Sequence, residues 1–274
     1  LGCPALLYLA AAGVGKIGIA DFDVIDTSNL QRQVIFNLSD VGKPKAEVAS
    51  ARLMQQNPLI EIKVYHDRIT KANALAIISD FDVVIDGTDN FPTRYLLNDA
   101  CVLSGKPLVY GSVLQFEGQV SVFNYVSEDG TRSANYRDLF PQPPSADSVP
   151  DCATAGVLGV VPGIIGSIQA AEAIKIITGT GQPLADRLLI LDTETMEQSI
   201  FNIPQKNTAA SIKSLIDYED FCGISAGKNK SLTANRINMK EVTVQELQKL
   251  KESDADFQLI DVREPYEYDI CNLE

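Results

Sequence analysis

The chain has 274 residues, 45% of them hydrophobic, and its 36 acidic against 23 basic side chains give a formal net charge of −13. This length allows one substantial core and the start of a second, while the acidic balance argues against a nucleic-acid-binding surface, which is basic. The five cysteines are far apart and form no C-x-x-C pair, which favours a reducing, cytoplasmic setting over a disulfide framework or a zinc site of paired thiolates.

The first part of the chain alternates between helical and strand patterns. Apolar residues at helical spacing predict a buried helix over 3–12, opened by Gly2 and Pro4. A short strand over 16–20 then ends at Asp21. The elements expected next are helices over 45–56, 72–79 and 94–104 and strands over 60–64, 81–85 and 108–111. Helices alternating with strands indicate an α/β fold with a Rossmann-like, mainly parallel sheet.

The pattern changes after residue 111. The expected elements are an antiparallel strand extension from 118–125, a Pro-rich loop over 138–155, an apolar helix over 161–178 and closing strands over 188–191 and 199–203. No apolar stretch reaches the length expected of a membrane span. The polar composition of 206–236 predicts a linker, and a small α/β unit begins near Ile237. We therefore expect domains over 1–205 and 237–274, in a chain cut at both ends.

Two charged residues follow the expected strands. Asp21 stands 19 residues after Gly2 and directly after a strand. That is the spacing between the last glycine of a Rossmann phosphate loop and the acid that binds ribose. Asp89 follows the apolar run 83–85, at the carboxyl end of a strand, where a carboxylate suits Mg²⁺.

Two basic residues complete the pattern. Lys45 follows Pro44 at a helix start, where free backbone N–H groups favour an anion. Arg32 supplies a forked donor suited to phosphate. Each charge alone fits an ordinary surface residue, but basic and acidic groups gathered at strand ends of one sheet indicate a nucleotide site.

Several ordered motifs resemble the MoeB/ThiF/HesA family, relatives of ubiquitin-activating enzymes. The resemblance covers roughly residues 1–205. The motifs are Asp21-Phe22-Asp23-x5-Asn29-Leu30-Gln31-Arg32-Gln33, Gly42-Lys43-Pro44-Lys45, Thr88-Asp89-Asn90, Phe116-Glu117-Gly118-Gln119, Asp151-Cys152-Ala153 and the run 163–170.

The resemblance implies an adenylyltransferase that uses ATP and Mg²⁺. Its substrate would be a small ubiquitin-like sulfur carrier, MoaD- or ThiS-like, for molybdopterin or thiamin synthesis, and the enzyme would be a homodimer. The carrier's terminal Gly-Gly carboxylate would attack the α-phosphate, giving an acyl-adenylate and pyrophosphate. By position, the nucleotide would be held by Gly2, Asp21, Asp23, Asn29, Leu30, Gln31, Arg32, Lys45, Asp89 and Asn90. Among these, Arg32 and Lys45 would stabilise phosphate charge and Asp89 would place Mg²⁺.

Cysteines distinguish branches of this family. Cys152 lies in the long loop, where family members use a cysteine to link to the carrier. The place of the family's first zinc-binding pair reads Asn135-Tyr136-Arg137-Asp138, so we expect a zinc-free branch. Residues 259–268 resemble the opening of a rhodanese domain, incomplete here, and Cys271 is too close to that motif to be its catalytic cysteine.

Two other function classes use some of the same residues. An NAD-dependent oxidoreductase would use Gly2 and Asp21 but leaves the other charges without roles. A non-catalytic scaffold that binds a carrier is the third reading. Four remaining residues are expected to be structural, as a surface histidine and as ion-pair or packing residues: His66, Arg68, Arg94 and Glu172.

Overall fold

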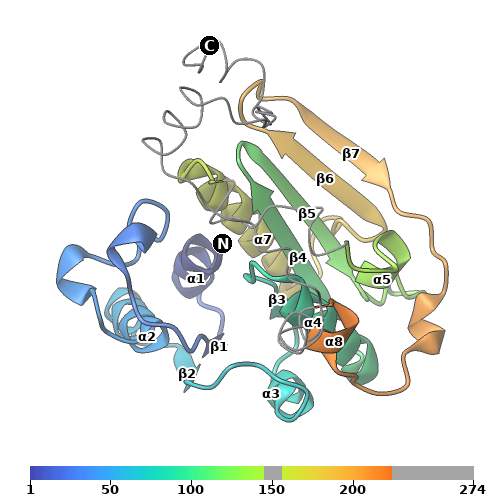
Figure 1. Ribbon diagram of the computed structural model, residues 1–274, viewed down its shortest axis with the longest axis horizontal. Coiled ribbons are helices and arrows are strands. Elements are labelled where there is room, and N and C mark those ends of the chain that lie inside the picture. The colour runs from blue at the N-terminus through green and yellow to red at the C-terminus, as the bar shows by residue number, and fades with distance from the viewer. Residues whose placement is uncertain (145–155, 224–274) are drawn as a thin grey trace, which may run out of the picture. The chain divides into compact units, whose positions relative to one another are not determined.

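The structure is a computed structural model that describes residues 1–144 and 156–223. The chain divides into two units, Leu1–Asn229 and Lys230–Glu274. The second unit lies outside the described residues, and so do Cys152, Cys271 and the rhodanese-like motif. The helices and strands labelled in Figure 1 all belong to the first unit.

The N-terminal half of this unit follows the expected alternation of helix and strand. Its elements are α1 (Gly2–Ala11), β1 (Lys16–Ala20), α2 (Lys45–Gln56), β2 (Glu61–Tyr65), α3 (Ala74–Ser79), β3 (Val84–Ile85) and α4 (Phe91–Ser104). Strands β1 and β2 form a parallel pair, with Ile17 opposite Ile62. Their boundaries and those of α2 agree closely with the sequence expectation.

The second half forms an antiparallel extension, as expected. Strand β4 (Leu108–Leu114) pairs in parallel with β3 and antiparallel with β5 (Glu117–Phe123). Then β6 (Arg187–Asp192) and β7 (Gln198–Asn202) complete the sheet order β3-β4-β5-β6-β7. The two parallel strand pairs therefore belong to different sheets: β3 and β4 to this one, and β1 and β2 to a separate two-stranded sheet.

Strand β3 is shorter than the predicted 81–85. Residue Phe81 does not extend the strand, because its backbone N–H turns back to the carbonyl of Ile78. Its ring instead packs over Gly18 of β1, where an added Cβ would lie 2.3 Å from Phe81 Cζ. An aromatic contact between β1 and the segment before β3 thus takes the place of strand pairing.

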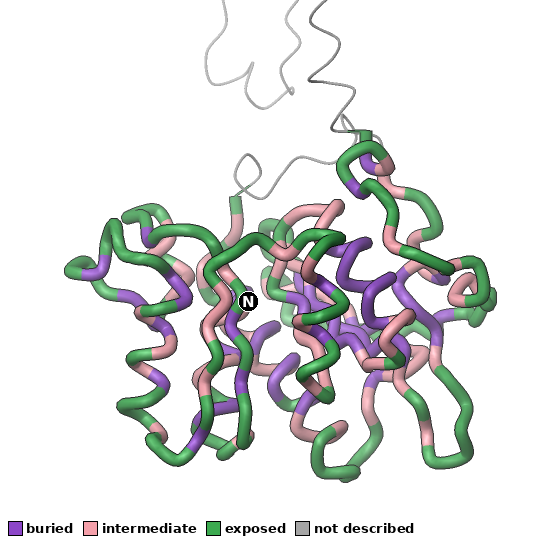
Figure 2. The backbone as a smooth tube through the Cα atoms, turned by 90° about the horizontal axis from the view of Figure 1, so that it is seen from below, coloured by how far each residue is buried: buried purple, intermediate pink, exposed green. Residues whose placement is uncertain are grey.

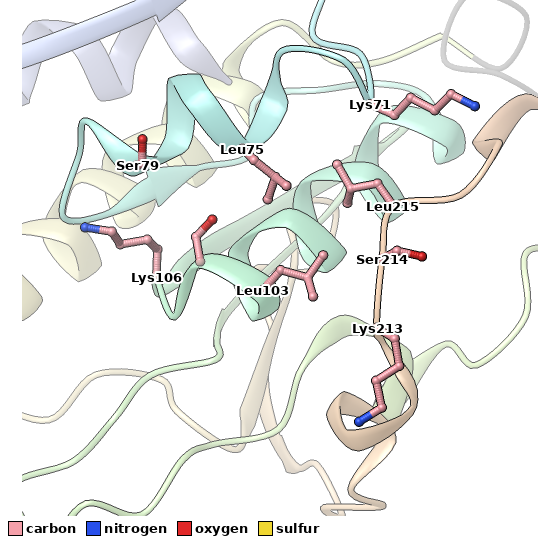
Figure 3. A pocket seen from close by; sticks show the side chains of 9 residues that line it. Lys71, Leu75, Ser79, Leu103, Lys106, Lys213, Ser214 and Leu215 are labelled. Atoms are coloured by element: carbon pink, nitrogen blue, oxygen red, sulfur yellow. The ribbon is translucent and has the colours of Figure 1, made fainter.

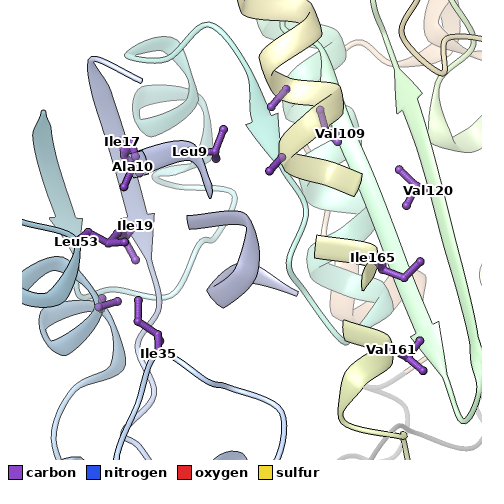
Figure 4. Close-up of a cluster of buried hydrophobic side chains, with 14 of the residues drawn as sticks. Leu9, Ala10, Ile17, Ile19, Ile35, Leu53, Val109, Val120, Val161 and Ile165 are labelled. Atoms are coloured by element: carbon purple, nitrogen blue, oxygen red, sulfur yellow. The ribbon is translucent and has the colours of Figure 1, made fainter. Parts of the chain in front are cut away.

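Helix α7 (Val160–Thr178) is the centre of the main core. It contacts α1 on one side and β4 and β5 on the other (Figures 1 and 4). Close approach depends on glycine: a Cβ at Gly166 would lie 2.4 Å from the Leu1 carbonyl, and one at Gly118 would lie 2.3 Å from Ile165. The buried cluster continues from α7 to β4 and β5 on one side and, past α1, to β1 and α2 on the other, as the labelled residues of Figure 4 show.

The length of α7 corrects one sequence expectation. At 19 residues it is long and apolar enough to cross a membrane by length and composition, whereas the sequence patterns predict no such stretch. It packs as a core helix, with 44% of its most apolar window buried. It also carries the buried carboxylate of Glu172, which pairs with Lys175 and accepts a 2.8 Å hydrogen bond from the Leu184 N–H.

A second core lies beneath β4–β7 and is aromatic. The rings of Tyr95, Tyr110 and Tyr136 are fully buried against one another and against Phe123. Short helices α5 (Tyr136–Leu139), η3 (Thr208–Ser211) and α8 (Tyr218–Phe221) cover it. Buried segments gather between the helices and the sheet, and exposed ones form the rim (Figure 2).

A buried polar network joins this core to the segment that follows β7. The Arg137 guanidinium donates two 2.8 Å bonds to Asp99, and Tyr218 Oη donates a third to the same carboxylate. The Asp138 carboxylate accepts from Thr208 Oγ1 at 2.8 Å. Residues 206–223, part of the predicted linker, therefore pack on the core.

Candidate active site

The first part of the site lies at the carboxyl end of β1. Asp21 accepts a hydrogen bond from the backbone N–H of Asp23 at 2.9 Å. The Asp23 carboxylate in turn pairs with Lys45 Nζ at 2.9 Å. Lys45 is only 8% exposed and begins α2, and both its ammonium and its backbone N–H are held by Asp23. Burial raises the pKa of Asp21, which also feels the negative charges of Asp23 and Asp89.

The second part is the loop after β1, a short 3₁₀ turn (η1, Thr27–Asn29). The Asp26 carboxylate accepts from Ser28 N–H at 2.8 Å, and Asn29 Oδ1 accepts from Asp26 N–H at 3.1 Å. Arg32 Nη1 donates to the Ser28 carbonyl at 3.0 Å. The turn therefore holds Arg32 by its own backbone and leaves its other donors available to an anion.

Gln31 fixes this loop against α7. A Cβ on Gly159, the residue that caps α7, would lie 2.2 Å from the Gln31 carbonyl oxygen. Only glycine allows so close an approach. The position of Arg32, one residue further on, thus depends on the start of a helix far away in the sequence.

The third part follows β3. Asp89 is exposed, and within the described residues its carboxylate makes no hydrogen bond or ion pair. Its negative charge contributes, after burial, to the raised pKa of Asp21, so the two carboxylates lie within electrostatic range of each other. Asn90 caps α4, since its side chain accepts from Thr93 N–H at 3.0 Å. The backbone N of Gly2 lies 3.4 Å from where a Cβ of Gly87 would be.

Beneath the third part lies a buried ion pair. Asp86 is fully buried, accepts from Thr88 N–H at 2.8 Å and Thr88 Oγ1 at 2.6 Å, and lies 3.3 Å from Arg94 Nε. Arg94 Nη2 donates to the Thr88 carbonyl at 3.0 Å. From α7, Gln169 Nε2 donates to the Asp86 carbonyl at 2.8 Å. These contacts set the path of the backbone into Asp89.

Of the two residues in this ion pair, the sequence predicts only Arg94. The expected ion-pair role of Arg94 is confirmed, and Arg68 with Glu219 and Glu172 with Lys175 are confirmed likewise. Asp86 is not among the residues that the sequence singles out. The available signal is its position directly after the apolar run 83–85, where an acid ends a strand.

Asp21, Asp23 and Lys45 lie together at the end of β1, Gly2 and Asp89 lie near the end of β3, which belongs to the other sheet, and Arg32 is held by the loop that follows β1. Cys152 cannot be placed with them, because it lies outside the described residues. At the place of a family zinc pair, Asn135 and Asp138 bind protein groups instead: Asn135 Nδ2 donates to Thr208 Oγ1 at 2.8 Å. Cys222 is buried nearby, and burial raises its pKa to about 11.

Comparison with known proteins gives consistent matches. The family model described as ThiF family matches residues 1–212. The "Probable adenylyltransferase/sulfurtransferase MoeZ" of Mycobacterium tuberculosis is 47% identical over 274 residues, covering 100% of this chain and 69% of that protein. The sulfur carrier protein adenylyltransferase of Thermus thermophilus is 48% identical over 232 residues, covering 82% and 85%.

Other matches are longer than this chain. The adenylyltransferase and sulfurtransferase MOCS3 of Culex quinquefasciatus is 43% identical, and the chain covers 63% of it. Escherichia coli MccB with MccA-N7isoASN is 22% identical with a TM-score of 0.64, covering 75% of this chain and 61% of that one. At that identity the likeness shows the fold. The chain spans less than two thirds of these last two proteins.

Proposed function

Since the chain belongs to the ThiF family, we propose that it uses ATP to adenylate the C-terminal Gly-Gly carboxylate of a small ubiquitin-like sulfur carrier. The carrier is MoaD- or ThiS-like and supplies sulfur for molybdopterin or thiamin. The names of the similar MoeZ, MOCS3 and Thermus proteins support this reading, because each contains the word adenylyltransferase.

One observation supports the proposal most directly: acids and cations gather at the carboxyl end of β1, at the start of α2 and after β3, and the charges of Lys45, Asp23 and Asp89 all act on Asp21. Asp21 would accept hydrogen bonds from the ribose hydroxyls. Lys45 and Arg32 would bind the triphosphate. The carrier's carboxylate, ionised at neutral pH, attacks the α-phosphorus, and the bond from that phosphorus to the α–β bridging oxygen breaks. Pyrophosphate leaves with the electron pair, so no general base is needed and charge stabilisation dominates.

Mg²⁺ fits the residues present. Asp89 offers an exposed carboxylate with no protein partner among the described residues, and Asp21 adds a negative charge within electrostatic range of it. Hard oxygen ligands of this kind suit Mg²⁺ together with phosphate oxygens. When bound, the ion would neutralise charge on the leaving pyrophosphate, and Asp89 would hold it.

Pyrophosphate exchange with purified carriers tests the proposal. Lys45→Ala or Arg32→Ala should lower carrier-dependent exchange on the order of 10²-fold or more, because each removes a cation from the phosphates. Lys43→Ala is the matched control: it removes an exposed cation of the same loop that pairs with Asp40 instead. Near-normal exchange in both test variants refutes the assignment, as does stabilisation by NADH without any by ATP.

The proposal extends to the parts outside the described residues. Residues 237–274 would belong to a rhodanese-like domain after a linker ending near 236, and the word sulfurtransferase in the MoeZ and MOCS3 names supports this. The Cys152 thiolate would attack the carbonyl carbon of the carrier acyl-adenylate, forming a thioester while the acyl–phosphate bond breaks and AMP leaves with the electron pair. Cys152→Ser should therefore spare pyrophosphate exchange and impair sulfur transfer. A cytoplasmic setting accords with free thiols at Cys3, Cys101 and Cys222.

A homodimer is part of the same proposal. One face of α7 lines an open apolar groove of about 500 Å³. The groove is formed by Val160, Gly163, Ile164, Ser167, Ile168 and Ala171. A second copy of the chain would cover this face. Ile164→Asp should yield a monomer in sedimentation velocity, and an unchanged oligomer would refute this interface.

A further inference from the structure

A second surface depression lies between α3, α4 and the segment that precedes α8. It has a volume of about 540 Å³. Three leucines point toward its middle from the three segments, and three lysines stand at its edge with their ammonium groups directed outward (Figure 3). The complete lining is Lys71, Leu75, Ser79, Leu103, Ser104, Lys106, Lys213, Ser214 and Leu215. We call this the lysine-rimmed pocket.

The lysines of the rim differ from most others in the described residues. Lysines at 16, 43, 45, 63 and 175 each have a carboxylate partner within 4.0 Å. Within residues 1–144 and 156–223, Lys71, Lys106 and Lys213 have none, and the only other such lysine is Lys206. In a chain with a net charge of −13, three unpaired cations around one depression are a local reversal of charge.

Three acidic residues near the pocket are engaged, whereas the exposed Asp82, which lies two residues before the β3–β4 pairing on its strand as Lys106 does on β4, has no partner among the described residues. Asp80, next to Ser79, pairs with Lys63 at 2.7 Å. Glu219 lies 3.8 Å from Arg68, and Asp217 caps α8 by accepting from the N–H groups of residues 219 and 220. The rim therefore keeps its positive charge available to a ligand, and the pocket lining contains no acid.

The pocket is separate from the nucleotide site. Helix α4 begins directly after Asn90 and ends at Ser104, which lines the pocket. Its 14 residues span about 20 Å at 1.5 Å per residue. That distance exceeds the screening length of about 8 Å at physiological salt, so Lys106, just beyond the end of α4, acts independently of the charges around Asn90.

We propose that the lysine-rimmed pocket binds an acidic peptide segment of a partner protein, with apolar side chains on the leucine floor and carboxylates against the lysines. The shallow, open form suits a polypeptide segment better than a small ligand, which needs enclosure. The lysine stems extend the apolar floor while their ammonium groups stay in water, which matches a segment that alternates leucine-like and acidic residues. This site does not depend on the proposed adenylation chemistry.

Fluorescence anisotropy with labelled synthetic peptides tests the proposal on the full chain. The probe is a short peptide of leucine and glutamate; the comparison peptides replace glutamate by lysine, or leucine by serine. The test variant is Lys71→Gln/Lys106→Gln/Lys213→Gln. The matched control is Lys206→Gln, which removes an unpaired lysine outside the pocket, and Leu75→Asp tests the floor at a 41% exposed position where the fold tolerates change.

We expect the leucine–glutamate peptide to bind, and the triple variant to weaken binding on the order of tenfold to a hundredfold, since each exposed ion pair contributes little alone. Lys206→Gln should have no effect, and Leu75→Asp should weaken binding. Equal binding of the lysine peptide, equal binding of the serine peptide, or full binding by the triple variant would each overturn the proposal. So would equal competition by inorganic pyrophosphate, which would identify a small-anion site.

Discussion

Replacing Arg94 by leucine is expected to leave the Asp86 carboxylate buried without its counter-charge. The Arg94 Nε to Asp86 Oδ2 distance is 3.3 Å, which at an effective dielectric constant of 20 corresponds to an attraction of about 5 kcal/mol. Burial opposes the charge on Arg94, yet Asp86, Tyr110 and Tyr136 together raise its pKa above the ordinary value. Losing one partner of such a pair costs about 3–5 kcal/mol of unfolding free energy.

Urea unfolding measures this cost without adding salt that would screen charges. The chain has no tryptophan, so near-ultraviolet circular dichroism of the buried tyrosines reports the unit that contains the pair. Lys63→Met is the control: it breaks the exposed pair with Asp80, at 44% and 41% side-chain exposure, and should cost less than about 1 kcal/mol.

A double variant separates the ion pair from simple loss of packing. In Arg94→Leu/Asp86→Asn the buried charge is gone, while the amide oxygen still accepts from Thr88. We expect the double variant to lose about 2 kcal/mol less unfolding free energy than the two single variants lose in sum. Strict additivity within about 0.5 kcal/mol, or a loss in Arg94→Leu as small as in the Lys63 control, would refute the reasoning.

Two further outcomes are expected. Gly159→Ala should lower the apparent affinity for ATP, measured by thermal stabilisation, at least tenfold (about 1.4 kcal/mol), because its Cβ would lie 2.2 Å from the Gln31 carbonyl oxygen. The control Gly163→Ala lies in the same helix, meets nothing within 4 Å and should retain the affinity of the unsubstituted protein. Equal effects of the two substitutions would contradict this prediction. The pKa of Asp21 is raised above its unfolded value by burial, so its ionised form opposes folding at neutral pH, and this penalty is lost as the pH falls through the folded-state pKa. Asp21→Asn should therefore raise the melting temperature at neutral but not at acidic pH while abolishing ATP stabilisation; a gain that is the same at every pH would contradict this.

The elements that the sequence predicts best carry local signals. Strand β1 and helix α2 agree to the residue, because an alternating apolar run specifies one and Pro44 marks the start of the other. Strand β3 is shorter than its prediction because the apolar run 81–85 does not distinguish a strand from an aromatic residue packed against Gly18. Local composition also fails to predict that residues 206–223 pack on the core, because their polar groups form hydrogen bonds with partners far away in the sequence.

Site residues divide along the same line. The positions of Asp21, Lys45 and Asp89 follow from local signals, since two of them follow a strand and Lys45 opens a helix, while their roles toward the nucleotide stay predictions. The partnership of Asp86 with Arg94 depends on the turn between β3 and α4, which spacing alone does not give. For Asn90 the structural role is the clearer one. Pro92 at the start of α4 marks Asn90 as the cap of that helix, whereas its role toward the nucleotide stays a prediction.

The position of α7 has a consequence for the order in which the protein folds during synthesis. It packs against α1, made about 160 residues earlier, and against β4 and β5. Until the ribosome has released Thr178, those apolar faces have no cover, and closing so long a loop is entropically slow. Nascent chains shorter than this should thus be the ones that chaperones bind or that aggregate. The helix that completes the core also completes the proposed nucleotide site, because Gly159 at its start packs against Gln31.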